Sequence, residues 1–228
     1  MINLDEIATQ LESTNSRDRL LALVSLREAS PEEALPLIKK VLYDEMLPVR
    51  SMAIFALGVK PTTESYPLLV KLLQTDEDYG IRADAAGALG YLGDNRAFEA
   101  LVRAFYEDES WLVRFSAAVS LGNLQDERAK ELLLEALDSN EPILQQAAIA
   151  GLGEIKALDT IDKIVNFADS EDWLTRQRLA EALGNLNSKK SISALNFLAK
   201  DSHSQVRDAA EFSLKQLSAP YGEVKSLE

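Results

Sequence analysis

The chain has 228 residues, 46% of them hydrophobic, with a formal net charge of −13 and an isoelectric point near 4.6. An acidic surface repels the phosphates of nucleic acids and anionic lipids, which makes both poor partners. The absence of cysteine excludes disulfides, thiolate metal sites and cysteine nucleophiles. No apolar run approaches the roughly 20 residues of a membrane helix, and residues 1–14 carry acids where a signal peptide needs bases. We therefore expect a cytoplasmic protein without membrane insertion.

A sevenfold internal repeat with a period of 31 to 32 residues runs along the chain. An arginine marks one position of the repeat, and Gln145 replaces it in one copy. A Leu-Gly pair follows seven and eight residues later in the five central copies, from Leu57-Gly58 to Leu183-Gly184. Self-similarity at this period is typical of a solenoid, in which each copy buries its apolar face only against its neighbours.

The apolar spacing predicts two short helices in each copy. In the fourth copy, Leu101 and Phe105 fall on one stripe of a first helix, and Val113, Ala117 and Leu121 fall on the buried side of a second helix over 111–123. The predicted fold is an all-α solenoid of about seven helix pairs, wound as a right-handed superhelix. In chain order the pairs are expected at 3–29, 32–60, 64–92, 95–124, 127–155, 158–186 and 189–217, followed by a flexible tail at 218–228.

The glycines of the Leu-Gly pairs call for a packing explanation. Glycine in a helix interior costs about 1 kcal/mol relative to alanine, so its recurrence in the last turn predicts a close approach of two helices. Gly93 and Asn187 occupy another repeat position, just past a helix end. Both are expected to adopt a left-handed backbone conformation there.

The pattern Asp…Val-Arg-x-x-Ala-Ala-x-x-Leu-Gly resembles the short HEAT-like repeats of the phycobilisome family. It runs here from Asp108 through Val113-Arg114 to Leu121-Gly122, and again from Asp76 through Ile81-Arg82 to Leu89-Gly90. The resemblance covers about residues 3–217. That family includes phycobilin lyase subunits and a phycobilisome-degradation protein. The resemblance implies binding to phycobiliprotein subunits and handling of their linear tetrapyrrole, a phycocyanobilin-like bilin held transiently rather than as a tight cofactor.

The recurring arginines predict a structural ladder. Four of them follow an acid by six residues, so each guanidinium is expected to bind the acidic turns of its own and the neighbouring copy. The ladder comprises Arg50, Arg82, Arg114, Arg176 and Arg207, with Arg19 in the first copy. Gln145 interrupts it, and Ser139 stands where its acid would be. A tolerated variation is favoured there over a local change of curvature.

Three aromatic residues share one repeat position, three residues before the arginine: Tyr79, Trp111 and Trp173. This position begins the second helix, and second helices line the concave surface of such solenoids. Exposed aromatics at a groove edge are good anchors for a protein or a flat conjugated ligand. The alternative is that they fill gaps between neighbouring copies.

The groove surface is predicted from the positions one, two and five residues after the arginine. The first four copies supply an apolar floor and the sixth supplies charges. The candidate residues are Met52, Phe55, Asp84, Gly87, Phe115, Val119, Gln177, Arg178 and Glu181. An apolar groove with a charged end suits a partner helix, or the tetrapyrrole that the resemblance implies, with its propionates on Arg178 or on a ladder arginine. A merely weakly polar helix surface is the alternative.

Residues for catalysis and metal binding are scarce. His203, the single histidine, is expected to be exposed in the turn before the last helix, and neighbours in a turn do not form an oriented triad. No histidine pair exists for a transition metal, so no metal site is predicted. Asp84 and Glu181 are the weak candidates for carrying a proton.

Several functions stay open at this point. The leading hypothesis, taken from the resemblance, is a phycobiliprotein-binding protein that promotes bilin detachment or phycobilisome degradation. The alternatives are a subunit of a bilin lyase, which would need a second HEAT-repeat chain, and a general adaptor that binds another acidic or helical protein. Formation of a homodimer also stays open. Whether the chain is an enzyme at all is left undecided.

Overall fold

The computed structural model describes residues 3–218, which are helical or irregular throughout and contain no strand. The contacts divide the chain into two compact units, an N-terminal unit of residues 1–126 and a C-terminal unit of residues 127–228. The expected tail at 218–228 lies outside the described residues, apart from Ser218 at the end of the last helix. An all-α fold is confirmed. The handedness of the whole array stays a prediction.

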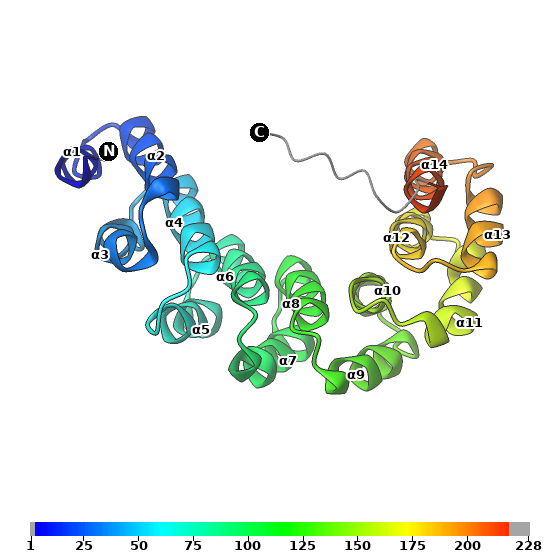
Figure 1. Ribbon diagram of the computed structural model, residues 1–228. Coiled ribbons are helices and arrows are strands. Elements are labelled where there is room, and N and C mark those ends of the chain that lie inside the picture. The colour runs from blue at the N-terminus through cyan, green and yellow to red at the C-terminus, as the bar shows by residue number, and fades with distance from the viewer. Residues whose placement is uncertain (1–2, 219–228) are drawn as a thin grey trace. The chain divides into compact units, whose positions relative to one another are not determined.

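The N-terminal unit consists of four helix pairs (Figure 1). Its helices are α1 (Leu4–Gln10), α2 (Ser16–Ser25), α3 (Pro31–Val41), α4 (Leu47–Val59), α5 (Ser65–Thr75), α6 (Tyr79–Leu92), α7 (Phe98–Glu107) and α8 (Trp111–Asn123), with 3₁₀ turns at Leu26–Glu28 and Asn95–Ala97. Each second helix packs on the next, α2 on α4, α4 on α6 and α6 on α8. We call these four helices the second-helix layer of this unit.

The C-terminal unit has three helix pairs. They are α9 (Glu127–Leu137) with α10 (Pro142–Glu154), α11 (Ile161–Ile164) with α12 (Trp173–Gly184), and α13 (Lys189–Leu198) with α14 (Ser204–Ser218). Here α10 packs on α12 and α12 on α14, which form the second-helix layer of this unit (Figure 1).

Helix starts follow the expected capping chemistry. The side chain of Asp78 accepts a hydrogen bond from the backbone N–H of Ile81 at 3.1 Å, and Asp172 accepts from the N–H groups of Leu174 and Thr175. Proline occupies the first position of α10 at Pro142, where the missing N–H has no helical partner to lose. These caps fix where each second helix begins, and thus where the residues at its first position point.

The leucines of the Leu-Gly pairs form the centre of each layer. Leu57, Leu89 and Leu121 have no exposed surface in the N-terminal unit, and Leu152 and Leu183 have none in the C-terminal unit. Burial of one leucine side chain contributes about 2 kcal/mol. The repeat motif is therefore a core motif.

The adjoining glycines confirm the predicted close approach. A Cβ on Gly58 would lie 2.9 Å from the Ala88 carbonyl oxygen, and one on Gly90 would lie 2.7 Å from the Ser120 hydroxyl of the next second helix. Gly153 and Gly184 face the following helix at similar distances. Glycine is required here because its missing side chain lets successive second helices touch.

The left-handed position is only partly as predicted. Gly93 has φ +66°, and the same repeat position is left-handed in the next two copies at Gln125 (φ 52°) and Lys156 (φ 53°). The prediction for Asn187 is wrong, because it has no positive φ. After Gly184 the chain instead tightens through hydrogen bonds from the N–H of Asn185 to Ala182 and from that of Leu186 to Leu183.

The sixth copy has an irregular first helix. The predicted stripe from Ile161 to Ala168 is one turn of α-helix, α11, placed between 3₁₀ segments at Leu158–Thr160 and Val165–Asp169. This stretch is rich in β-branched residues, aspartate and asparagine, which have low helix propensity. Ile161 and Ile164 of the predicted stripe are buried, whereas Val165 and Ala168 are only partly buried.

Candidate functional site

The repeat arginines join successive helix pairs within each unit. Arg82 donates from Nε to Asp108 Oδ2 at 2.8 Å and from Nη2 to Asp108 Oδ1 at 3.0 Å. Arg176 makes the same two-pronged contact with Asp201, at 2.6 and 2.9 Å. Arg19 pairs with Asp44, and Arg50 pairs with Asp76. A second hydrogen bond runs to the carbonyl six residues earlier in the chain for Arg19, Arg82, Arg176 and Arg207.

These ion pairs hold the acids ionised. Burial opposes the charged form of Asp108, but hydrogen bonds from the Arg82 guanidinium and the Ser110 N–H outweigh it, so the pKa of Asp108 lies below its ordinary value. The hydrogen bond from Arg176 is the largest influence on Asp201 and likewise lowers its pKa. These arginines therefore connect each helix pair to the next and stabilise the packing between them.

The interruption at Gln145 has a structural counterpart in the next helix pair. Gln145 Nε2 still donates to the Ser139 carbonyl, six residues earlier, at 2.7 Å. The position where an acid would receive an arginine from this copy is Ser170. The neighbouring residue supplies the connection instead, because Gln146 Nε2 donates to Asp172 at 2.7 Å. A hydrogen bond from the neutral Gln146 amide to the Asp172 carboxylate thus replaces the arginine–aspartate ion pair between α10 and α12.

The three aromatics of the shared position begin their helices as predicted. Tyr79 is the first residue of α6, Trp111 of α8 and Trp173 of α12, with 56%, 54% and 36% of their surface exposed. Trp173 stacks on His203 with ring centroids 4.1 Å apart and an angle of 13° between the rings. Trp173 therefore fills the space beside the next turn, whereas Tyr79 and Trp111 keep more than half of their surface open.

The expectation that His203 is exposed is wrong. Its ring is half-buried by the stack on Trp173, and its Nδ1 is buried without a hydrogen-bond partner among residues 3–218. The backbone N–H of His203 donates to Asp201 at 2.8 Å. This side chain belongs to the packing between α12 and α14.

Arg178 and Glu181 bind each other on the second-helix layer of the C-terminal unit. Arg178 Nη1 lies 2.7 Å from Glu181 Oε2, and Gln177 Nε2 donates to Glu181 Oε1 at 2.9 Å. Glu181 and Gln177 also line a hollow of about 460 Å³ between α12 and α14, beside Phe212. The charges expected at this end of the groove are thus largely mutually compensated.

The second-helix layer of the N-terminal unit carries two neighbouring aromatic side chains that are open to solvent. Phe55 on α4 and Tyr91 on α6 are 50% and 66% exposed, and their rings meet edge to face with centroids 6.0 Å apart. Met52 lies one turn before Phe55 and is partly buried, and Asp84 and Gly87 lie on α6 two turns and one turn before Tyr91. We call Met52, Phe55, Asp84, Gly87 and Tyr91 the α4–α6 face.

Sequence reasoning identified four residues of this face and missed Tyr91. The predicted groove positions stopped five residues after the arginine, whereas Tyr91 stands nine residues after Arg82. Its spacing of four from Gly87 and seven from Asp84 is the signal that places it on the same helix face. Phe115 and Val119, the candidates on the neighbouring α8, are both partly buried.

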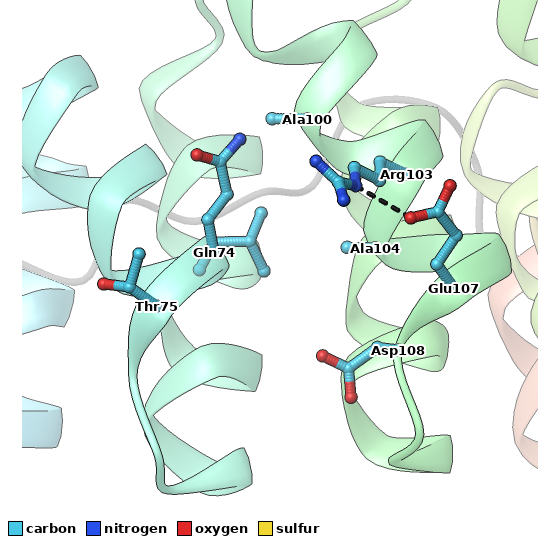
Figure 2. Close-up of a pocket in the computed structure, with 8 residues that line it drawn as sticks. Gln74, Thr75, Ala100, Arg103, Ala104, Glu107 and Asp108 are labelled. Carbon is cyan, nitrogen blue, oxygen red and sulfur yellow. Dashed lines mark hydrogen bonds and ion pairs between the residues drawn. The ribbon is translucent and has the colours of Figure 1, made fainter.

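The opposite, first-helix layer of the N-terminal unit is hollowed between α5 and α7 (Figure 2). This hollow of about 420 Å³ is lined by Leu73, Gln74, Thr75, Ala100, Arg103, Ala104, Glu107 and Asp108. Arg103 Nε donates to Glu107 at 2.8 Å, as Figure 2 shows. None of the predicted ligand-binding residues lines it.

Residues 3–218 contain no group of three or more histidine, cysteine, aspartate or glutamate side chains arranged to hold a metal ion. Over the same residues, no helix combines the length and apolar character needed to cross a membrane.

Comparison with known proteins identifies the type of repeat and the fold. The description HEAT repeats matches the chain over residues 4–87, 66–150 and 131–215. No curated protein matches its sequence. Among solved structures, the chain is similar to the complex of CpcE and CpcF of phycocyanin lyase from Nostoc sp. PCC7120, with a TM-score of 0.59 and 19% identity over 95% of each chain.

Two other solved structures are similar. A structure of Kap95p with RanGDP has a TM-score of 0.57 and 15% identity over 94% of this chain and 35% of that chain. Human deoxyhypusine hydroxylase has a TM-score of 0.43 and 21% identity over 94% of this chain and 95% of that chain. The two structures with TM-scores above 0.5, at identities of 15–19%, show a shared all-α solenoid fold and nothing more. Since HEAT repeats match from residue 4 to residue 215, the chain belongs to the HEAT-repeat family.

Proposed function

We propose that this protein acts by binding another protein on the α4–α6 face, and that its partner is a phycobiliprotein subunit. The observation that carries the binding role is the pair Phe55 and Tyr91, two aromatic side chains at least half exposed on adjacent helices. Aromatic side chains provide a large contact area at low entropic cost and are enriched among the residues that dominate binding energy. Adjacent exposed aromatic rings form a contiguous apolar patch, which is typical of an interaction site.

Two observations support a phycobiliprotein as that partner. The repeat Val113-Arg114 to Leu121-Gly122 resembles the HEAT-like repeats of the phycobilisome family. The fold is also similar, over 95% of both chains, to the complex of CpcE and CpcF of phycocyanin lyase. We propose that binding promotes detachment of the bilin or disassembly of the phycobiliprotein.

A second candidate function is that of a bilin lyase subunit, which attaches the bilin instead. The similarity to the CpcE and CpcF complex favours it, because that neighbour is an assembly of two chains. In this alternative the chain requires a second HEAT-repeat chain before it acts. A general adaptor without a tetrapyrrole role is what remains if neither candidate holds.

An absorption titration against holo-phycocyanin, with size exclusion on the same mixture, tests these functions. A co-eluting complex with lost or shifted bilin absorbance supports detachment. A complex with apo-phycocyanin and free bilin, formed only after a second HEAT-repeat chain is added, supports the lyase alternative. An unchanged spectrum with no complex in either form rejects the phycobiliprotein as partner. Tyr91→Ser is the variant to compare, since it removes an exposed ring without opening the core.

A further inference from the structure

Gly87 is a helix-interior glycine that the protein's own packing does not require. A Cβ built on Gly87 meets no atom within 4 Å, whereas a Cβ on Gly90, in the next turn of α6, would lie 2.7 Å from the Ser120 hydroxyl. Glycine weakens a helix at such a position. The absent side chain leaves a gap in the row of side chains on the outer surface of α6, which we call the depression. A partner can approach the helix backbone there.

Asp84 is a carboxylate without a counter-charge at the edge of this depression. It lies three residues before Gly87 on the same face of α6 and is partly buried. Within residues 3–218 it has no hydrogen bond or ion pair, in contrast with Asp44, Asp108 and Asp201, which arginines hold. This carboxylate is therefore free to pair with a cation that a partner supplies.

Phe55 and Tyr91 complete the chemistry of the face. Tyr91 lies one turn beyond Gly87, and the Phe55 ring contacts it from α4 at a centroid distance of 6.0 Å. Aromatic ring faces attract cations, and their edges bury aliphatic groups. The face therefore presents a depression bounded by a carboxylate on one side and two aromatic rings on the other.

We infer that the α4–α6 face binds an amphipathic helix of the partner that carries one arginine or lysine within its apolar stripe. Charge complementarity is the reason to expect a basic residue on the partner helix. The single charged group of the face is the unpaired Asp84, and the whole chain carries a net charge of −13, so a basic residue is attracted and an acidic one repelled. The apolar stripe covers Met52, Phe55 and Tyr91, and the helix backbone passes over Gly87. This inference rests on the proposed protein-binding role and names the partner's chemistry.

The test is selection from a displayed library of 20-residue amphipathic helices in which one position of the apolar stripe is randomised. Wild-type protein is expected to enrich arginine and lysine at that position. Asp84→Lys is expected to enrich glutamate and aspartate at the same position. Enrichment of apolar residues by both proteins, or an identical preference in both, overturns the inference.

The affinity of one selected helix for matched variants of the protein is then measured by fluorescence anisotropy. We expect Asp84→Asn to weaken binding about tenfold, as loss of one desolvated charge pair does. Glu32→Gln, which removes one acid from α3 in the other layer, should leave binding unchanged. Gly87→Gln is expected to fill the depression and abolish binding while the protein remains folded. Ala100→Gln adds the same side chain to α7 as its control. Equal affinity for Gly87→Gln and wild type contradicts the inference.

The outcome separates this inference from the partner named above. If phycocyanin fails to bind while basic helices are selected, the partner assignment is wrong and the chemistry of the face stands. If phycocyanin binds and Asp84→Lys and Gly87→Gln bind it equally well, the partner stands and the α4–α6 face is not its binding site. A dimer of this chain that Tyr91→Ser dissociates would also overturn the inference, because a second copy would then cover the face.

Discussion

Gly87 and Gly90 lie three residues apart on one helix and have opposite structural roles. Alanine at position 87 meets open space and should raise the free energy of unfolding by about 0.5–1 kcal/mol, because it removes backbone freedom from the unfolded chain. Alanine at position 90 would be forced against Ser120 and should lower it by about 1–3 kcal/mol. Urea unfolding of the two variants measures both. Equal effects at the two positions would contradict the packing described for α6.

At the scale of single residues, sequence reasoning predicted the repeated roles better than the unique ones. The Leu-Gly positions recur, so their burial and close approach followed from periodicity. Tyr91 and the stack of Trp173 on His203 each occur once. Periodicity carries no information on a contact that only one copy makes. The side-chain packing that half-buries His203 is visible only in three dimensions.

The arginine ladder predicts how stability depends on pH. The pKa values of Asp44, Asp108 and Asp201, which pair with repeat arginines, all lie below the ordinary value in the folded protein. The unfolded chain therefore takes up protons near pH 4, where aspartate ordinarily titrates, while the folded protein does not. The stabilisation is fully present above about pH 4–5 and is lost as the pH falls through the lower, folded pKa values.

Substitution of one acid tests this dependence. Asp108→Asn leaves the half-buried Arg82 guanidinium without its carboxylate and should cost about 2 kcal/mol at pH 7. The cost should be smaller at pH 3, because the unfolded wild-type chain is largely protonated there and the ion pair then stabilises the fold less. Arg82→Lys keeps the charge but cannot make the two-pronged contact, so it should cost about 1 kcal/mol. Urea unfolding between pH 3 and pH 7 measures the free energy of unfolding of wild type and of both variants. A pH-independent cost for Asp108→Asn would show that the pair is not ionic.

The missing ion pair at Gln145 offers a gain of stability. Replacing Gln145 by arginine and Ser170 by aspartate would place a donor and an acceptor where other copies have them. Each single substitution adds a charge without a partner. The free energy of unfolding of the double variant should exceed the value expected from the two single variants by about 1 kcal/mol. A double-mutant cycle measured by urea unfolding reports this coupling. Strictly additive effects would mean that α10 and α12 hold these positions too far apart.

Elements were predictable wherever apolar spacing and helix propensity agree. The second helix at Trp111–Asn123 has the bounds that the spacing predicts. In the sixth copy the spacing was right but residues such as Asn166 and Asp169 oppose an α-helix, and 3₁₀ turns result. Asn187 lies where the sequence suggested a left-handed residue, but local hydrogen bonds after Gly184 turn the chain without one. Helix ends depend on such local competition more than on the repeat.

Across the molecule, the two units carry second-helix layers of different chemistry. The N-terminal unit exposes Phe55 and Tyr91 around the unpaired Asp84. The C-terminal unit also exposes an aromatic ring, Phe212, but the polar side chains Arg178, Glu181 and Gln177 of its α12 bind one another. Composition averaged over 228 residues hides this contrast, and the repeat pattern, which records what copies share, hides it too. Functional differences reside in positions where copies diverge.

This contrast predicts where a partner protects the protein. Hydrogen exchange measured with and without holo-phycocyanin should show slower exchange of backbone amides in α4 and α6, because a helix lying over Gly87 covers that face. Amides of α12 and α14 should exchange at unchanged rates, since the charged side chains there already bind each other. Asp84→Lys is the control and should lose the protection while its unbound exchange matches wild type. Protection confined to α12 and α14 would move the binding site to the C-terminal unit, and would leave the exposed Phe55 and Tyr91 rings without a partner.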